Sequence, residues 1–376
     1  MIYDVVIIGA GIIGMLNAIA AGLSGKTVLL LDKACQPPEW QSSIHPCGRI
    51  HAYNLKSIEF MEELGIWHNI DELAKHNFTG LKVVAGNSEL SIGADNNMGT
   101  FVSSVAMLSA LMRKIADLEH VKIQWQSEIM AIRQSSDLVS IILKDKRIQA
   151  EIAIACDGGN SWVRKNLGIP CKTHNFNQSC FVGFLEFDGC HNNVAWQDFT
   201  GSGTLGLLPY GANMYSLAWS LDNVIANDID NSNILDKLNN MRFPAEISSL
   251  ISLKNLQKFP LYALHAKNYF SNRVVLAGDA CHAIHPLAGL GLNLGVADVK
   301  TLSACLYNDI SVDIAFASYE HKQIQINKMV MDGLTAMQQL FKNQAICSAA
   351  ISIANNPMIK NALEALANQR NIYTMV

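Results

Sequence analysis

Short, almost wholly apolar runs separated by glycine mark the first part of the chain. One run covers residues 3–8 (YDVVII), and a second, TVLLLD, ends at Asp32. Runs of this kind are typical of strands that a parallel sheet buries on both faces. Between them, NAIAAGLSG has the composition of a helix that ends at Gly25. The pattern therefore predicts a strand, a helix and a second parallel strand at the start of the chain.

The pattern changes after residue 170. Residues 205–221 (LGLLPYGANMYSLAWSL) alternate between apolar and polar or small side chains, which is typical of antiparallel strands with one packed face and one face toward a pocket. Residues 104–118 fit a helix, and residues 272–310 return to the strand, loop and helix pattern of the start. We therefore expect an α/β fold: a Rossmann-like lobe with an inserted antiparallel β-sheet lobe, followed by C-terminal helices.

Composition narrows the class of protein. Half of the 376 residues are hydrophobic, 16% are charged, and the net charge is −4 without a block of lysine or arginine. This length favours two lobes, and the charge argues against a nucleic-acid surface. Nine cysteines without a C-x-x-C pair favour reduced thiols. Because there is no secretory signal and no apolar run that spans a bilayer, we expect a cytoplasmic protein, with peripheral contact at the inner membrane as the other option.

A G-x-G-x-x-G motif joins the first predicted strand to the helix. Gly9 permits the tight turn, Gly11 lets the backbone approach a pyrophosphate, and Gly14 lets the helix pack on the strand. The helix N-terminus offers unpaired N–H groups to phosphate, and Asp32 can accept hydrogen bonds from ribose hydroxyls. The spacing predicts a dinucleotide site, and it suits FAD and NAD equally.

Two more acids follow predicted strands. Asp157 comes after an apolar run in IQAEIAIACDGGNSWVRKNLGI (148–169), where Ser161 and Arg164 fall on a predicted helix. On its own, Asp157 fits a local cap of that helix. Asp279 ends the run RVVLAGDA, and the glycines of the following segment open another helix.

Two other kinds of site, a zinc site and a hydrolase nucleophile elbow, compete with a dinucleotide site. His282 and His285 have the spacing of half a zinc site, but the loop lacks the third ligand that zinc needs. No metal is therefore expected, and the two histidines are predicted to hydrogen-bond the backbone of the loop. A hydrolase would need a G-x-S-x-G elbow, which the sequence lacks.

The three motifs, in this order, resemble the class A flavoprotein aromatic monooxygenases, whose fold is that of p-hydroxybenzoate hydroxylase. More narrowly, GDACHAIHPLAGLGLNLGVADV (278–299), RIHAYNLKSIEFMEELGIW (49–67) and GLLPYGANMYSLAW (206–219) resemble the ubiquinone-biosynthesis hydroxylases, which act on polyprenylated phenols. The resemblance covers essentially the whole chain.

With FAD as the implied ligand, the pattern divides the chain into a discontinuous FAD-binding domain, a substrate-binding β-sheet domain and C-terminal helices. In that order, these comprise residues 1–75, 100–170 and 266–330; residues 76–99 and 171–265; and residues 331–376. The apolar tail at 328–354 is expected to pack on the FAD-binding lobe, with a membrane or partner contact as the alternative.

The resemblance implies which residues hold FAD. Asp279 is implied to bind the ribityl hydroxyls, and the start of the late helix to present N–H groups to the pyrimidine edge of the flavin, where a helix N-terminus stabilises negative charge. Catalytic residues stay unknown, and Tyr210 and Pro286 are the substrate-side candidates. The implied cofactor-binding residues are Gly9, Gly11, Ile13, Gly14, Asp32, Lys33, Arg49, Asp157, Asp279, Gly291, Leu292 and Asn293.

The resemblance also implies the chemistry. NAD(P)H, a transient reductant, reduces FAD, dioxygen adds to give a flavin hydroperoxide, and one oxygen is transferred to the phenol ring. The role of the protein itself is to bind FAD, to exclude water and to orient the phenol ring. Two alternatives stay open: a flavin enzyme of this fold with another small aromatic substrate, and a non-catalytic flavoprotein that serves other ubiquinone-biosynthesis proteins as a partner.

The sequence departs from the family at four positions. Ser104 and Leu108 stand where the family usually carries a polar or basic residue and a glutamine. Leu290 replaces a common glutamine, and Ala297 replaces a common arginine.

Overall fold

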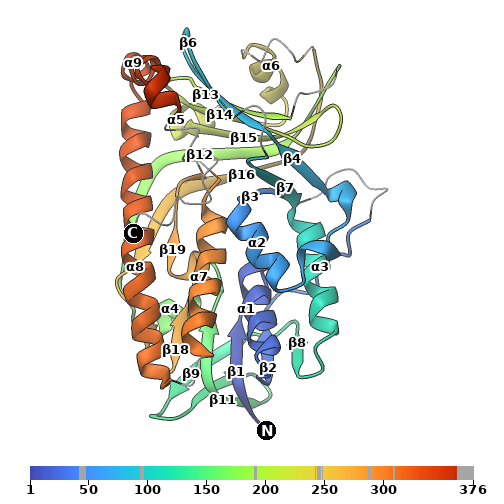
Figure 1. Ribbon diagram of the computed structural model, residues 1–376, viewed down its shortest axis with the longest axis vertical. Coiled ribbons are helices and arrows are strands. Elements are labelled where there is room, and N and C mark those ends of the chain that lie inside the picture. The colour runs from blue at the N-terminus through green and yellow to red at the C-terminus, as the bar shows by residue number, and fades with distance from the viewer. Residues whose placement is uncertain are drawn as a thin grey trace.

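Two lobes lie one above the other along the long axis of the molecule (Figure 1). The computed structural model describes residues 1–41, 48–93, 97–189, 193–241, 243, 247, 249–286, 289–307 and 310–361. The expected combination of a Rossmann-like lobe with an inserted sheet is confirmed.

The first lobe contains an eight-stranded mixed sheet. Its strands from β18 to β8 run parallel. The residues of β18 and β2, and those of the second halves of β1 and β11, are apolar and buried. The order along the sheet is β17 (Phe270–Ser271), β18 (Val274–Leu276), β11 (Arg147–Ala155), β1 (Ile2–Ile8), β2 (Val28–Leu31) and β8 (Val121–Gln124). An antiparallel extension of β11 is formed by β10 (Val139–Leu143) and β9 (Ile129–Gln134).

Helices cover this sheet. Helix α1 (Ile12–Leu23) packs between α3 (Ser104–Ala116) and α7 (Gly291–Leu306). The helix that NAIAAGLSG predicts begins earlier than that segment, because Gly11 takes the N-cap position of α1. The shorter α2 (Leu55–Glu63) packs on α7, and α4 (Trp162–Asn166) follows β11.

The second lobe contains the other eight-stranded sheet. Its neighbouring strands are antiparallel except for β13 and β5, which pair in parallel. Strand β5 comes from a segment that precedes the main insertion. The order is β19 (His282–Ala283), β16 (Leu250–Ala266), β12 (Cys171–Phe187), β15 (Met214–Asp222), β14 (Gly203–Pro209), β13 (Val194–Phe199), β5 (Gly80–Ala85) and β6 (Ser88–Ile92). The short helices α5 (Asn223–Ala226) and α6 (Ile234–Asn239) pack on this sheet.

A small third sheet lies between the lobes (Figure 1). Its strands are β3 (Ile50–Tyr53), β7 (Gly99–Ser103) and β4 (Lys75–Phe78), with β7 in the middle. The described part of the chain also contains the short 3-10 helices η1 (Trp67–Asn69), η2 (Glu72–Ala74) and η3 (Gly278–Ala280).

The C-terminal helices connect the two lobes. Helix α8 (Val312–Phe341) has 30 residues, and at about 1.5 Å per residue it is long enough to run beside both lobes. The Tyr319 hydroxyl donates to the Leu276 carbonyl in the first lobe, and the Gln338 amide donates to Gln178 in the second. Helix α9 (Gln344–Ala354) packs on β5 and β6. The buried side chains of the tail at residues 328–354 pack against the second sheet, so the expectation that this tail packs on the first lobe is wrong. Residues 362–376 lie outside the described part of the chain.

Within the described residues, none of the helices combines the length and the apolar character that a membrane crossing requires.

Candidate functional site

The ends of four parallel strands form one edge of the first sheet. Ile8 at the end of β1 is in register with Leu31 of β2 and with Ala155 of β11, and Ala155 is in register with Leu276 of β18. Gly9 follows directly after Ile8. This is the edge at which open α/β sheets bind ligands.

The three acids named from the sequence all lie at this edge. Asp32 comes one residue after β2, Asp157 two residues after β11, and Asp279 three residues after β18. The register of the strands thus brings together segments that are far apart in the sequence.

The glycine motif leaves a backbone cradle at the start of α1. Gly9 has φ +102°, and a Cβ there would lie 2.4 Å from the Cys156 carbonyl oxygen. A Cβ at Gly14 would lie 1.8 Å from the Gly9 oxygen, so these two glycines are needed for close packing. Around Gly11, by contrast, a Cβ would meet nothing within 4 Å. Because α1 has no side-chain cap and no acid in its first turn, its first N–H groups are available to an anionic ligand.

Asp32 supports this cradle. Its Oδ2 accepts from the Ala10 N–H at 2.6 Å, and its Oδ1 accepts from the Ala34 N–H at 2.7 Å. A carboxylate oxygen has more than one acceptor position, so these bonds orient Asp32 without using all of its acceptor capacity. Its neighbour Lys33 is exposed.

Asp157 uses its two oxygens differently. Oδ2 accepts from the Val163 N–H at 3.0 Å, which is the capping role that the sequence suggested. Oδ1 is buried and has no hydrogen-bond partner. A buried carboxylate oxygen without a donor is costly, and a ligand hydroxyl or N–H would satisfy it.

Arg164 connects the loops that carry Asp157 and Asp279. Its guanidinium is buried and donates to the Gly159 carbonyl at 2.9 Å and to the Ala280 carbonyl at 2.6 Å. Ser161 caps α4 by accepting from the Arg164 N–H. The predicted helix residues therefore join two motifs of the site.

Asp279 is exposed, yet protein atoms crowd its carboxyl group. This desolvation raises the pKa of Asp279, while the positive charges of His282 and Arg49 act in the opposite direction. The Arg49 guanidinium lies 4.5 Å from the centroid of the Phe259 ring on β16. Arg49 and Asp279, named separately from the sequence, thus belong to one electrostatic environment.

The start of α7 offers a second helix N-terminus. Leu290 takes the N-cap position without a side-chain hydrogen bond, and Leu292 packs on the core of the lobe. The Asn293 side chain donates to the carbonyl of Ala52 and accepts from the hydroxyl of Ser57. Since this side chain is occupied in fixing α7, only the backbone N–H groups of this turn can serve a ligand.

Ile13 packs where the early and late motifs meet. Cβ atoms at Gly278 and Gly295 would lie 3.1 Å and 2.7 Å from its side chain. Only glycine lets α1, α7 and the loop before Asp279 approach this closely, and a Cβ at Gly291 would have looser contacts, the nearest being 3.6 Å away.

The two substrate-side candidates differ in burial. Tyr210 is buried and its ring centroid lies 4.2 Å from that of His76, whereas Pro286 is exposed. Tyr210 packs in a cluster with Phe184, Phe101 and residues of β3.

The loop histidines have side-chain partners. His282 Nε2 lies 2.6 Å from Asp298 Oδ2, and His285 Nε2 lies 3.2 Å from Gln178 Oε1. The sequence predicted backbone partners for these histidines and did not predict the side-chain partners. Sequence reasoning passed over Asp298, although an acid inside the apolar helix segment GLNLGVADV signals a buried partner.

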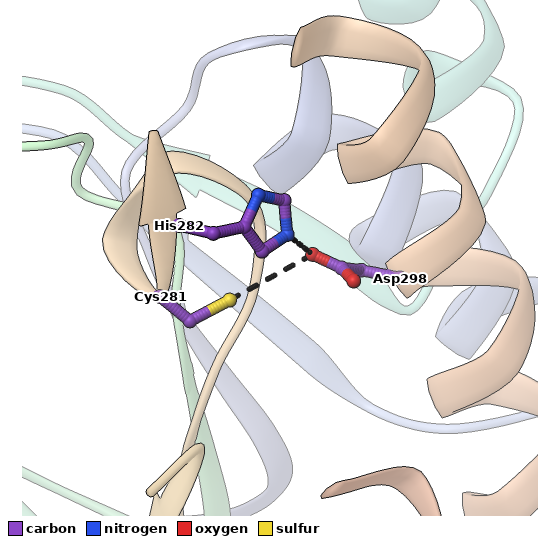
Figure 2. Close-up of side chains that lie close together, drawn as sticks. All are labelled: Cys281, His282 and Asp298. Atoms are coloured by element: carbon purple, nitrogen blue, oxygen red, sulfur yellow. Dashed lines mark hydrogen bonds and ion pairs between the residues drawn. The ribbon is translucent and has the colours of Figure 1, made fainter. Parts of the chain in front are cut away.

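Cys281, His282 and Asp298 bring three ligand-type atoms within 4.8 Å of one another (Figure 2). The 2.6 Å between the histidine nitrogen and the carboxylate oxygen is a hydrogen-bond distance. Two ligands of a tetrahedral zinc ion, at bond lengths of about 2.0 Å, would lie about 3.3 Å apart. The geometry fits an ion pair better than a metal centre.

The four departures from the family pattern have ordinary structural roles. The Ser104 hydroxyl accepts from the Arg49 N–H at 3.1 Å, and Leu108 packs on the core of the lobe. Leu290 occupies the N-cap position of α7, and the Ala297 carbonyl accepts from the Gln323 amide.

Comparisons with known proteins agree with this geometry. The protein family described as FAD binding domain matches residues 2–333. The 3-demethoxyubiquinol 3-hydroxylase of Escherichia coli (strain K12) is 29% identical over an alignment of 340 positions, which covers 87% of this chain and 85% of that protein. The ubiquinone biosynthesis monooxygenase COQ6 of Danio rerio is 27% identical over an alignment of 409 positions, which covers 91% of this chain and 83% of that protein. The crystal structure of p-nitrophenol 4-monooxygenase PnpA from Pseudomonas putida DLL-E4 has a TM-score of 0.80 at 18% identity and covers 99% of both chains. This last likeness supports the fold alone.

Proposed function

Because this chain belongs to the FAD binding domain family, whose match covers residues 2–333, we propose that it hydroxylates the aromatic ring of a polyprenylated phenol in ubiquinone biosynthesis. The chain is an FAD-dependent monooxygenase. The relatives named for ubiquinone biosynthesis align over most of this chain, and this supports the narrower substrate class.

The observation that carries the proposal is the common sheet edge that holds Asp32, Asp157 and Asp279. FAD fits the groups found there. Its phosphates suit the open backbone at Gly11, and its hydroxyl groups suit acids such as Asp157, whose Oδ1 has no protein donor. We assign the binding of FAD to the twelve residues named from the sequence, within segments 1–75, 100–170 and 266–330.

The chemistry that FAD would supply when bound is the use of electrons from NAD(P)H to activate dioxygen, one oxygen atom of which is added to the ring while the other leaves as water. The residues of this chain do the positioning. Asp279 would accept hydrogen bonds from the sugar-alcohol chain of the cofactor, and the first N–H groups of α7 would stabilise negative charge on the flavin ring.

The apolar cluster around Tyr210 is assigned to the substrate side. Ala52 belongs to this cluster, and a Cβ at Gly289, just before α7, would lie 3.5 Å from the Ala52 Cβ. The cluster also contains the stacked rings of Phe78 and Phe101, whose centroids are 4.4 Å apart. A phenol ring bound beside this cluster would be oriented by its apolar side chains, which would also exclude water.

Contact with the membrane and with other ubiquinone-biosynthesis proteins is part of the proposal. Large apolar side chains are exposed on α9 and just after it: Ile346, Ile353 and Met358. A polyprenylated substrate resides in lipid, so a peripheral contact at this end of the molecule would shorten its path. Sedimentation with phospholipid vesicles measures this contact directly.

The test of the function uses purified protein loaded with FAD. NAD(P)H consumption should rise when a polyprenylated phenol is added, and mass spectrometry with ¹⁸O-labelled dioxygen should find one labelled oxygen on the product ring. Asp279→Ala should lose this activity, while Asp236→Ala, an exposed acid on α6, should retain it. Stimulation only by a phenol without a prenyl tail would replace the proposal with a small-phenol hydroxylase. Binding of FAD without any turnover would favour a non-catalytic partner.

A further inference from the structure

His282 and Asp298, drawn in Figure 2, form a buried ion pair, and Asp298 contacts Gly278, the residue before Asp279. His282 follows this loop as the first residue of β19, and Asp298 is on α7. Their side chains are 1% and 0% exposed, and the 2.6 Å bond between them is a close contact for a charged hydrogen bond.

Asp298 fixes the loop through more than one donor. Its Oδ2 accepts from the Gly278 N–H at 2.9 Å as well as from His282. Gly278 has φ +64°, a left-handed conformation that glycine adopts readily, and it sets the backbone direction at Asp279. The orientation of Asp279 therefore depends on a carboxylate with no access to solvent.

The pair also connects both lobes to the loop. His282 lies opposite His265 where β19 pairs with β16 in the second sheet. From α8, the Asn327 amide donates to Asp298 Oδ1 at 3.2 Å and to the Tyr269 hydroxyl at 3.2 Å. The Asp298 carboxylate thus binds residues of three elements: Gly278 of η3, His282 of β19 and Asn327 of α8.

The surroundings favour a charged His282. Burial alone would lower its pKa, but the charge and the hydrogen bond of Asp298, together with the charge of Asp279, raise it above the ordinary value. Burial and the positive charge of His282 lower the pKa of His265, which keeps that neighbour neutral. The titratable groups around His282 are Asp298 from α7, Asp279 and Cys281 from the loop, His265 from β16, and Tyr269, which follows β16.

We propose that the His282–Asp298 ion pair is a positioning device for FAD, which holds the Gly278–Asp279 loop in the conformation that binds the cofactor. The inference rests on the proposed function, because it takes Asp279 as a ligand-binding residue. FAD should bind to the form in which His282 is protonated.

A pH dependence of FAD affinity follows from this assignment. Because the pKa of His282 is raised in the folded protein, the pair is intact below the ordinary histidine pKa of about 6.5. Its contribution is lost as the pH rises through the raised pKa. FAD affinity should fall in this direction.

The test titrates apoprotein with FAD, followed by flavin fluorescence, from about pH 6 to about pH 9.5. His282→Gln keeps an N–H donor for Asp298 but has no charge. It should bind FAD about tenfold more weakly at the acidic end, and its affinity should not change with pH. His285→Gln is the matched control, since burial and nearby Lys342 lower the pKa of His285 to about 4, so that it is already neutral. This control should keep the affinity and the pH profile of the wild type.

A second measurement needs no variant. The ¹⁵N chemical shifts of the His282 imidazole in the wild-type protein should show a mostly charged ring at about pH 6.5, where an ordinary histidine is half charged. A neutral ring, or a His282→Gln protein with the affinity and pH profile of the wild type, would overturn the proposal. If His282→Gln does not fold, the wild-type pH profile and the imidazole shifts decide. Wild-type protein that binds no FAD would instead refute the function on which the inference rests.

Discussion

At the residue scale, the glycines of the first motif have separable roles. Gly14 is surrounded by backbone, whereas the space around Gly11 is open toward the sheet edge. Gly11 also has φ −75°, a conformation that alanine adopts without strain. One substitution therefore disturbs folding and the other disturbs only the ligand.

Gly14→Ala should destabilise the fold, because its Cβ would lie 1.8 Å from the Gly9 oxygen. We expect a loss of about 2–3 kcal/mol in the free energy of unfolding, measured by urea denaturation of the apoprotein.

Gly11→Ala should leave that free energy within about 1 kcal/mol of the wild type but weaken FAD binding by about tenfold or more. Equal effects of the two substitutions on stability would contradict the assignment of Gly11 to the ligand.

The sequence identified the acids of the site but not the ion pair behind them. Asp32, Asp157 and Asp279 each follow an apolar run, and such runs are recognisable because parallel strands are buried on both faces. The partner of His282 lies 16 residues further along the chain, on a helix. Its identity depends on how α7 packs behind the loop, which no local pattern encodes.

At the element scale, the C-terminal helices hold the lobes together through buried side chains. Ile351 of α9 is 4% exposed and packs in a cluster with Leu90 and Phe199 of the second sheet, while Ile353 on the same helix is 63% exposed. The two residues share their chemistry and differ in burial.

Ile351→Ala should therefore lower the free energy of unfolding by about 2–4 kcal/mol, measured by urea denaturation. Ile353→Ala should change it by less than about 0.5 kcal/mol. If both substitutions had the same small effect, the packing of α9 on β5 and β6 would be wrong.

Helical periodicity predicted these C-terminal helices but not where they pack. The contact between Gln338 and Gln178 joins residues that are 160 positions apart. An apolar stripe predicts that one face of a helix is buried. Which element covers that face depends on the tertiary fold.

At the scale of the whole molecule, the chain passes between the lobes several times, and the site lies where it does so. The loop of Asp279 leaves the first sheet and continues into β19 of the second sheet. Asn327 of α8 donates a hydrogen bond to Asp298, which holds this loop. Binding of FAD at this position should stabilise both lobes together, because a ligand that binds only the folded state raises the unfolding temperature.

The central claim is that three distant segments meet at one sheet edge to bind a single FAD. An equilibrium titration of the apoprotein with FAD tests this most directly, with Asp279→Ala compared against Asp236→Ala. We predict one FAD per chain, an affinity lowered by about tenfold to 100-fold in Asp279→Ala, and no change in Asp236→Ala. Binding that is absent in the wild type, or equal in all three proteins, would contradict the account.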